Sequence, residues 1–102
     1  MSDLKPNIKF NYLYRDAGNY KQFGSVVFKN PSNLKEEVVD AILHNHLIDQ
    51  EYFSHIKFGI PSLFFETQNT DDHCWHEYES IISTDENPTD ERTIEEFIKL
   101  VE

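Results

Sequence analysis

The sequence predicts an α+β domain: a small antiparallel sheet with two helices on one face, in the order β-β-α-β-β-α. Two observations predict this class. Four short stretches are rich in apolar and aromatic residues, and two further stretches repeat apolar residues at helical spacing. Because the strands come in consecutive pairs, an antiparallel sheet is favoured over a parallel one. The length of 102 residues fits a single domain over residues 1–102.

The first two predicted strands form a hairpin. Residues 7–14 alternate apolar and polar side chains, and residues 24–29 form a second apolar run. Between them, the Gly-Asn pair at 18–19 fits the central positions of a type II′ turn, which needs glycine first. This turn predicts that Phe10 lies opposite Val27.

A helix is predicted to begin near Leu34. Asn33 and Glu36 have the spacing of a capping box, and the proline at position 31 ends the preceding strand. The residues expected on the buried stripe of this helix are Leu34, Val38, Ala41 and Ile42.

The middle of the chain gives weaker patterns. Residues 47–58 contain apolar side chains without a clear period, so no regular element is predicted there. Residues 62–67 predict a short third strand after a Gly-Ile-Pro turn, and residues 75–82 predict a fourth.

The last helix is predicted to begin at residues 87–89, which read Asn-Pro-Thr. Asp90 and Glu91 would then complement the positive end of its dipole. The apolar residues expected on one face of this helix are Ile94, Phe97, Ile98 and Val101.

The net charge of −10 is concentrated in the second half of the chain. Residues 1–51 carry six basic and seven acidic side chains, whereas residues 52–102 carry three and twelve. Such an acidic surface repels phosphate backbones, so it disfavours nucleic acid and favours a basic protein partner. A single cysteine, no leader and no apolar run of about 18 residues predict a cytoplasmic protein that does not enter the membrane.

Residues 71–79 hold the densest group of chemically versatile side chains. They include two histidines, the only cysteine and the only tryptophan. Cysteine and histidine are typical zinc ligands. On a strand, however, His73 and His76 are three residues apart and would point to opposite faces. Ligands from another part of the chain are therefore needed to complete a site. The predicted zinc ligands are His73, Cys74 and His76, with His44 or His46 completing the set.

Two carboxylates in the same stretch give a second chemical hypothesis. Glu77 and Glu79 share a face of a regular strand, as do the carboxylate pairs of acid/base hydrolysis. Acids on a sheet edge more often stay solvated and discourage edge pairing. We therefore assign no catalytic residue.

The first hairpin also interleaves aromatic and basic residues, as sheets that bind single-stranded RNA do. The residues concerned are Tyr12, Tyr14, Arg15, Tyr20 and Lys21. The competing interpretation is a buried aromatic face with two surface cations. We favour the second because this half of the chain has no basic excess.

The function that the sequence favours is a non-enzymatic protein-interaction module. A basic partner would contact the last helix and the fourth strand, and the glutamates expected in the contact are Glu77, Glu79, Glu91, Glu95 and Glu96. An alternative function that would use the same negative charge is that of a nucleic-acid mimic, which inhibits a DNA-binding protein.

Several short motifs occur together in the chain. Residues 11–16 read Asn-Tyr-Leu-Tyr-Arg-Asp, residues 19–21 Asn-Tyr-Lys, residues 24–28 Gly-Ser-Val-Val-Phe, and residues 72–79 contain Asp-His followed by Trp-His-Glu-Tyr-Glu. With these motifs the chain resembles a group of small bacterial hypothetical proteins of similar length. The resemblance covers most of the chain, implies a bacterial origin and transfers no catalytic residue.

Overall fold

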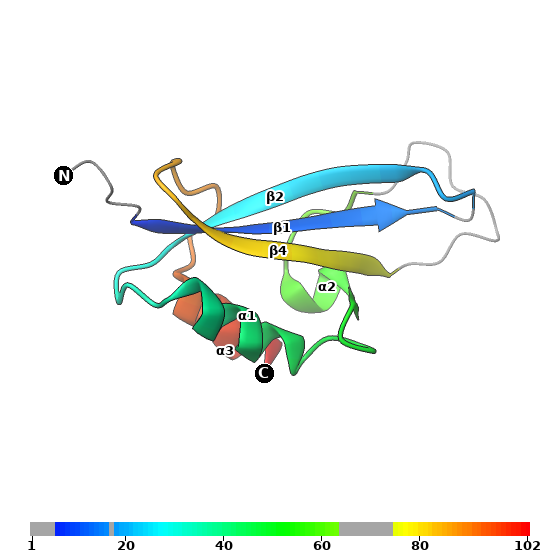
Figure 1. Ribbon diagram of the computed structural model, residues 1–102. Helices are drawn as coiled ribbons and strands as arrows, with labels where there is room; N and C mark the ends of the chain where they lie inside the picture. Colours follow the sequence, from blue (N-terminus) through cyan, green and yellow to red (C-terminus); the bar gives the residue numbers. More distant parts are fainter. Residues whose placement is uncertain (1–5, 17, 64–74) are drawn as a thin grey trace.

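The fold is a four-stranded antiparallel sheet with helices packed against it (Figure 1). The computed structural model describes residues 6–16, 18–63 and 75–102. Along the chain the elements are β1 (Asn7–Arg15), β2 (Lys21–Lys29), α1 (Glu36–His44), β3 (Tyr52–Phe53), α2 (His55–Phe58), β4 (His76–Thr84) and α3 (Ile94–Val101). The strand order in the sheet is β2-β1-β4-β3. The predicted α+β class with an antiparallel sheet is therefore confirmed.

The predicted order β-β-α-β-β-α is wrong in its middle part. Described elements follow the order β-β-α-β-α-β-α, because β3 and α2 lie in the stretch for which no element was predicted. Both are too short to give a periodic signal. Ser62 and Leu63 belong to no strand, and residues 64–67 of the predicted third strand lie outside the described residues.

Three described helices, rather than two, contribute to one core on one face of the sheet. Figure 1 shows α1 and α3 side by side beneath the strands. Alternate residues of β1 point to these helices, since Ile8 and Phe10 are fully buried. The other main contributors to the core are Val26, Phe28, Val39, Leu43, Phe58, Ile81, Ile94, Phe97 and Val101.

The register of the first hairpin differs from the prediction by one residue. Phe10 lies opposite Val26, not opposite Val27. The peptide N–H of Asp16 donates to the carbonyl of Tyr20, and the carbonyl of Asp16 accepts from Asn19, whose φ is 66°. This is the pattern of a three-residue loop that ends in a left-handed residue, and it replaces the predicted two-residue turn. A slip of one residue puts the opposite set of β2 side chains in the core.

Helix α1 begins later than predicted and buries a different stripe. Asn33 has a φ of 53°, so it lacks the extended backbone of an N-cap, and Lys35 occupies that position instead. Val39 and Leu43 are fully buried, while Val38 is 46% exposed. The cause is tertiary: the α1 face that carries Glu36 docks on β4 through a hydrogen bond from a peptide N–H of that strand. Of the four residues predicted on the buried stripe, Leu34 and Ile42 are partly buried against the core and Ala41 is exposed.

Helix α3 begins at Ile94, five residues after the predicted Asn-Pro-Thr start. Thr93 is its N-cap and forms a reciprocal capping box with Glu96. The predicted apolar face is confirmed, because all four of its residues are buried. Asp90 does not lie in the first turn of the helix but pairs with Arg92 before it.

Candidate functional site

The predicted glutamate pair on β4 is divided by a β-bulge. Tyr12 lies opposite Tyr78 and Asn11 opposite Ser80, so Glu79 faces no residue of β1. Glu77 is 6% exposed and its carboxylate lies 2.9 Å from Nε of Arg15. Because one glutamate is buried in an ion pair and the other is exposed, the two do not form a matched catalytic pair.

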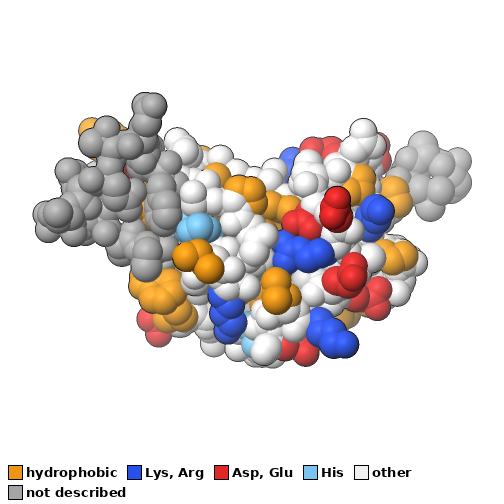
Figure 2. All heavy atoms as spheres, turned by 180° about the vertical axis from the view of Figure 1, so that it is seen from behind, with side chains coloured by type: hydrophobic (Ala, Val, Ile, Leu, Met, Phe, Trp, Pro, Cys, Tyr) orange, Lys and Arg blue, Asp and Glu red, His pale blue; other side chains and the backbone are white. Residues whose placement is uncertain are grey.

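The start of α3 carries the exposed acidic group. Glu91, Glu95 and Glu96 are all exposed. Glu95 accepts a hydrogen bond from the hydroxyl of Ser32 at 2.8 Å, and one oxygen of Glu96 accepts from the peptide N–H of Thr93 at 2.9 Å. Neutral donors do not cancel a carboxylate charge, so all three negative charges remain. Figure 2 shows acidic side chains, with lysine and arginine side chains between them, on the part of the molecule away from the larger group of grey residues.

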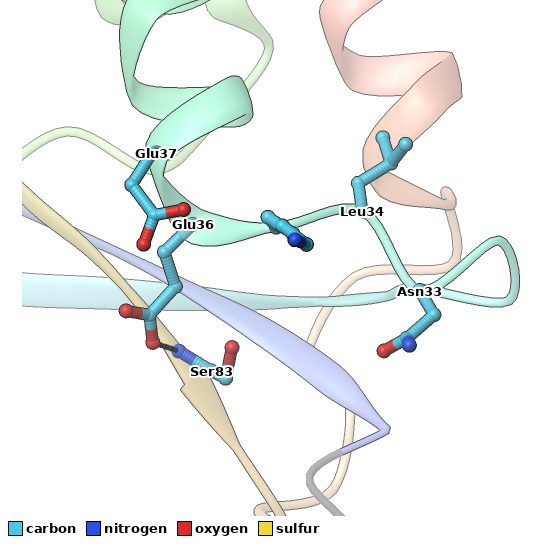
Figure 3. A pocket seen from close by; sticks show the side chains of 6 residues that line it. Asn33, Leu34, Glu36, Glu37 and Ser83 are labelled. Carbon is cyan, nitrogen blue, oxygen red and sulfur yellow. Dashed lines mark hydrogen bonds between the residues drawn. The ribbon is translucent and has the colours of Figure 1, made fainter.

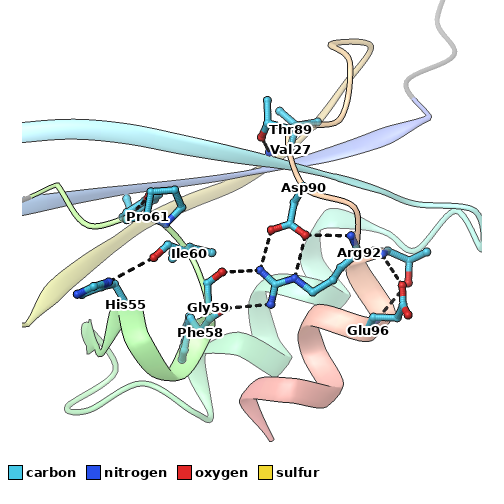
Figure 4. Close-up of polar contacts among 12 residues, drawn as sticks. Val27, His55, Phe58, Gly59, Ile60, Pro61, Thr89, Asp90, Arg92 and Glu96 are labelled. Carbon is cyan, nitrogen blue, oxygen red and sulfur yellow. Dashed lines mark hydrogen bonds and ion pairs between the residues drawn. The ribbon is translucent and has the colours of Figure 1, made fainter.

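Arg92, the one basic residue within this acidic group, is turned into the protein. Its guanidinium donates to the Asp90 carboxylate at 2.7 Å, to the carbonyl of Phe58 at 3.0 Å and to that of Gly59 at 2.9 Å (Figure 4). It also lies over the rings of Phe28 and Phe97, with 5.4 and 5.3 Å to the centroids. The side chain is 23% exposed. Its charge is therefore used inside the fold, where it joins the start of α3 to the end of α2.

The same contact shifts the titration of Asp90. The hydrogen bond from the Arg92 side chain, together with its charge and its peptide N–H, lowers the pKa of the Asp90 carboxyl below its usual 3.8, and partial burial opposes this only in part. The Asp90 carboxylate is thus fixed in its charged form at neutral pH. We did not predict this pair, although Arg92 is the only lysine or arginine between Lys57 and Lys99.

The five predicted contact glutamates do not share one surface. Glu79 belongs to β4, Glu95 and Glu96 belong to the first turn of α3, and Glu91 lies in the segment just before the N-cap Thr93. Helix α1 contacts both β4 and α3, whereas β4 and α3 have little contact with each other. The fold therefore separates Glu79 from the other exposed glutamates. Glu77 is buried and so does not contribute to a contact surface.

The histidines predicted as zinc ligands are placed in different environments. His44 and His46 lie at the end of α1, where Nδ1 of His44 contacts the carbonyl of Asp40 at 2.9 Å. His76 is fully buried, and its Nε2 accepts the peptide N–H of Leu63 at 2.9 Å. His73 and Cys74 lie outside the described residues. Within the described ranges, no three His, Cys, Asp or Glu side chains are grouped so as to hold a metal ion.

A second polar cluster joins α1 to β4. The hydroxyl of Tyr78 donates to the carboxylate of Asp40, and the ring of His44 meets the ring of Tyr78 edge-on at 5.0 Å. Burial, followed by the hydrogen bond to Asp40, raises the pKa of Tyr78 well above its usual 10. At neutral pH this hydroxyl is therefore a hydrogen-bond donor that holds the helix to the sheet. Spacing along the chain provides no signal for this pair.

A shallow pocket lies where α1 meets β4 (Figure 3). It is lined by Asn33, Leu34, Lys35, Glu36, Glu37 and Ser83. The carboxylate of Glu36 points across it and accepts the peptide N–H of Ser83. This contact satisfies a backbone donor on the outer side of β4, so the main polar group of the pocket already has a structural role.

The aromatic residues of the first hairpin do not form an exposed nucleic-acid platform. Tyr12 and Tyr14 are 1% and 0% exposed. The hydroxyl of Tyr12 donates to the carbonyl of Pro61 at 2.7 Å, and burial raises the pKa of Tyr12 to about 12. The favoured interpretation, a buried aromatic face, is therefore confirmed for these two rings.

Comparisons with known proteins add no relative. No family model, curated protein or solved structure matches the chain. The resemblance to small bacterial hypothetical proteins stays a prediction. Among the described residues, no helix combines the length and apolar character needed to cross a bilayer.

Proposed function

We propose that the domain is a non-enzymatic protein-interaction module that binds a basic partner through the start of α3. The observation that supports this is the inward position of Arg92. Its guanidinium is bonded to Asp90 and to two backbone carbonyls, and among the described residues no ion pair joins it to the exposed glutamates around it. The contact surface is formed by Glu91, Glu95 and Glu96.

The partner chemistry follows from this charge. Exposed carboxylates on a fixed helix start attract lysine and arginine side chains, and such attraction acts mainly on the rate of association. Because exposed charges are screened by salt over about 8–10 Å, the complex should form more slowly as ionic strength rises.

The experiment compares two triple variants that lose the same charge. In the first, Glu91, Glu95 and Glu96 are changed to glutamine; a glutamine at position 96 retains the capping box. In the control, Glu37, Glu51 and Glu79 are changed to glutamine, all of them exposed and outside the α3 start. Proteins captured on each immobilised variant at low salt are identified and their association rates are measured.

Loss of a basic protein from the first variant, with capture retained by the control, supports the proposal. Equal loss from both variants contradicts it, because the attraction would then depend on net charge alone. The nucleic-acid mimic is separated by adding duplex DNA: a mimic must be displaced from its partner by DNA, whereas another kind of interaction module need not be.

A further inference from the structure

The outer edge of β2 is divided into an occupied half and an open half. β2 is the first strand in the sheet order, so only one side of it pairs with β1. Near its end, the peptide N–H of Val27 donates to the hydroxyl of Thr89 at 2.9 Å, and the carbonyl of Val27 accepts the peptide N–H of Thr89 at 2.9 Å. The backbone of Val27 therefore points away from β1.

The same direction applies to alternate residues further along the strand. The β1–β2 register is unbroken from Asn7–Lys29 to Arg15–Lys21. In an antiparallel ladder, every second residue directs its N–H and C=O to the same side. Phe23 and Ser25 therefore direct their backbone groups outward, and no residue in the described ranges bonds to them. Both residues are exposed, Phe23 by 60%.

The occupied half of this edge is covered by a bent segment of the chain rather than by a strand. The chain's own residues 89–93 run along it, through Thr89 at Val27 and a parallel bridge between Lys29 and Thr93. The open half continues the same row of donors and acceptors. An added strand there would pair with these outward donors and acceptors, as in strand addition to a free sheet edge.

The open half, residues 21–25, carries one basic side chain and no acidic one. The other two lysines between residues 17 and 35 lie outside the open half, Lys29 at the bridge to Thr93 and Lys35 at the N-cap of α1. Lys21 is exposed at the start of the open half, and Tyr20 beside it is 72% exposed. Two copies meeting through this edge would bring lysines together between bodies of like net charge. An acidic segment is therefore the complementary occupant.

We infer that residues Lys21 to Ser25 bind an extended segment of a partner protein by strand addition, with an acidic residue near Lys21 and an apolar residue against Phe23. Backbone groups of Phe23 and Ser25 supply the hydrogen bonds. This surface and its partner are independent of the basic partner at α3, and either can exist without the other.

The test uses a short blocked peptide in which valine and threonine alternate with glutamate, and a counterpart with lysine in place of glutamate. Amide hydrogen exchange of the protein is followed by NMR. The acidic peptide should slow the exchange of the Phe23 and Ser25 amides, while Gln22 and Gly24, which face β1, serve as internal controls. Failure of the acidic peptide at millimolar concentration, or equal protection by the lysine peptide, overturns the inference.

Two variants sharpen the result. Lys21→Glu should weaken binding of the acidic peptide about two- to fivefold, whereas the matched Lys57→Glu on α2 should not. Ser25→Pro removes only an outward N–H, as edge strands tolerate, and should abolish protection at Phe23. Protection that rises with protein concentration in the absence of peptide would assign the edge to a second copy and overturn the inference. Binding lost in Glu91, Glu95 and Glu96 variants would instead point to the α3 surface.

Discussion

Arg92 donates from Nη2 to the carbonyl of Gly59 at 2.9 Å, which joins the start of α3 to the end of α2. Gly59 has a φ of 66°, the left-handed conformation that ends α2. The arrangement places one guanidinium between two helix ends and two aromatic rings. Two short helices, of four and eight residues, are thereby held at a fixed relative position.

Replacing Arg92 should therefore destabilise the whole domain. Arg92→Ala leaves two carbonyls and the Asp90 carboxylate without their donor, and we expect the free energy of unfolding to fall by about 2–4 kcal/mol. Arg92→Lys keeps the positive charge but lacks the planar, forked guanidinium, so its free energy of unfolding should lie between those of the wild type and Arg92→Ala. Urea denaturation measures both, with the exposed Lys99→Ala as the control. A change below about 0.5 kcal/mol in Arg92→Ala would contradict this role.

The Asp90 carboxylate should make stability depend on acid pH. Because its pKa is lower in the folded protein than the usual 3.8, the unfolded chain takes up this proton first as pH falls. Its contribution is complete above about pH 5 and is lost as pH drops through the folded pKa. The stability difference between the wild type and Asp90→Asn should therefore shrink from about pH 6 to about pH 2. Thermal denaturation at each pH measures this difference, and a difference that does not change with pH would contradict the role of the Asp90–Arg92 pair. Asp85→Asn, at an exposed residue, is the control.

Removing the hydroxyl of Tyr78 should loosen α1 from β4. Tyr78→Phe loses a hydrogen bond to the Asp40 carboxylate, and we expect a loss of about 1–3 kcal/mol. Tyr20→Phe, at a side chain that is 72% exposed, should change little. Because the folded pKa of Tyr78 is raised above 10, the wild type should also lose stability as pH rises above that value. Tyr78→Phe should not show this loss of stability at alkaline pH. An equal loss in the wild type and the variant would show that Tyr78 is not its cause.

Gly24 and Leu63 should be energetically coupled. A β-carbon at Gly24 would meet Cδ2 of Leu63 at 2.6 Å, so this side chain must move in Gly24→Ala. The carbonyl and the peptide N–H of Leu63 are both hydrogen-bonded, which limits the movement. In a double-mutant cycle, Gly24→Ala should reduce the free energy of unfolding by about 1 kcal/mol less in the Leu63→Ala background than in the wild type. Additive effects would show that Leu63 does not restrict this position.

The zinc hypothesis makes a separate prediction. Protein purified without chelator should contain one zinc ion per chain, and chelation should lower its melting temperature. His73→Ala and Cys74→Ser should abolish both effects, whereas the exposed Asn45→Ala should abolish neither. Metal analysis that finds no zinc removes the hypothesis.

Local patterns predicted those elements whose residues are buried on one side. The alternation in β1 and the apolar face of α3 were predicted correctly because these side chains pack in the same core. The acidic character of the α3 start was also evident, since Glu91, Glu95 and Glu96 need no partner to carry charge. The position of Arg92 was not predicted, because the carbonyls of Phe58 and Gly59 come from a distant part of the chain.

The sequence by itself determined the class of the fold, the buried faces of β1 and α3, and the concentration of negative charge in the second half. These depend on side-chain type and on short periods along the chain. Only the tertiary structure decided the hairpin register, the start of α1 and the separation of Glu77 from Glu79. Each depends on a contact between distant segments or on one extra residue in a turn or bulge, and a shift of one residue turns a strand's side chains from core to solvent.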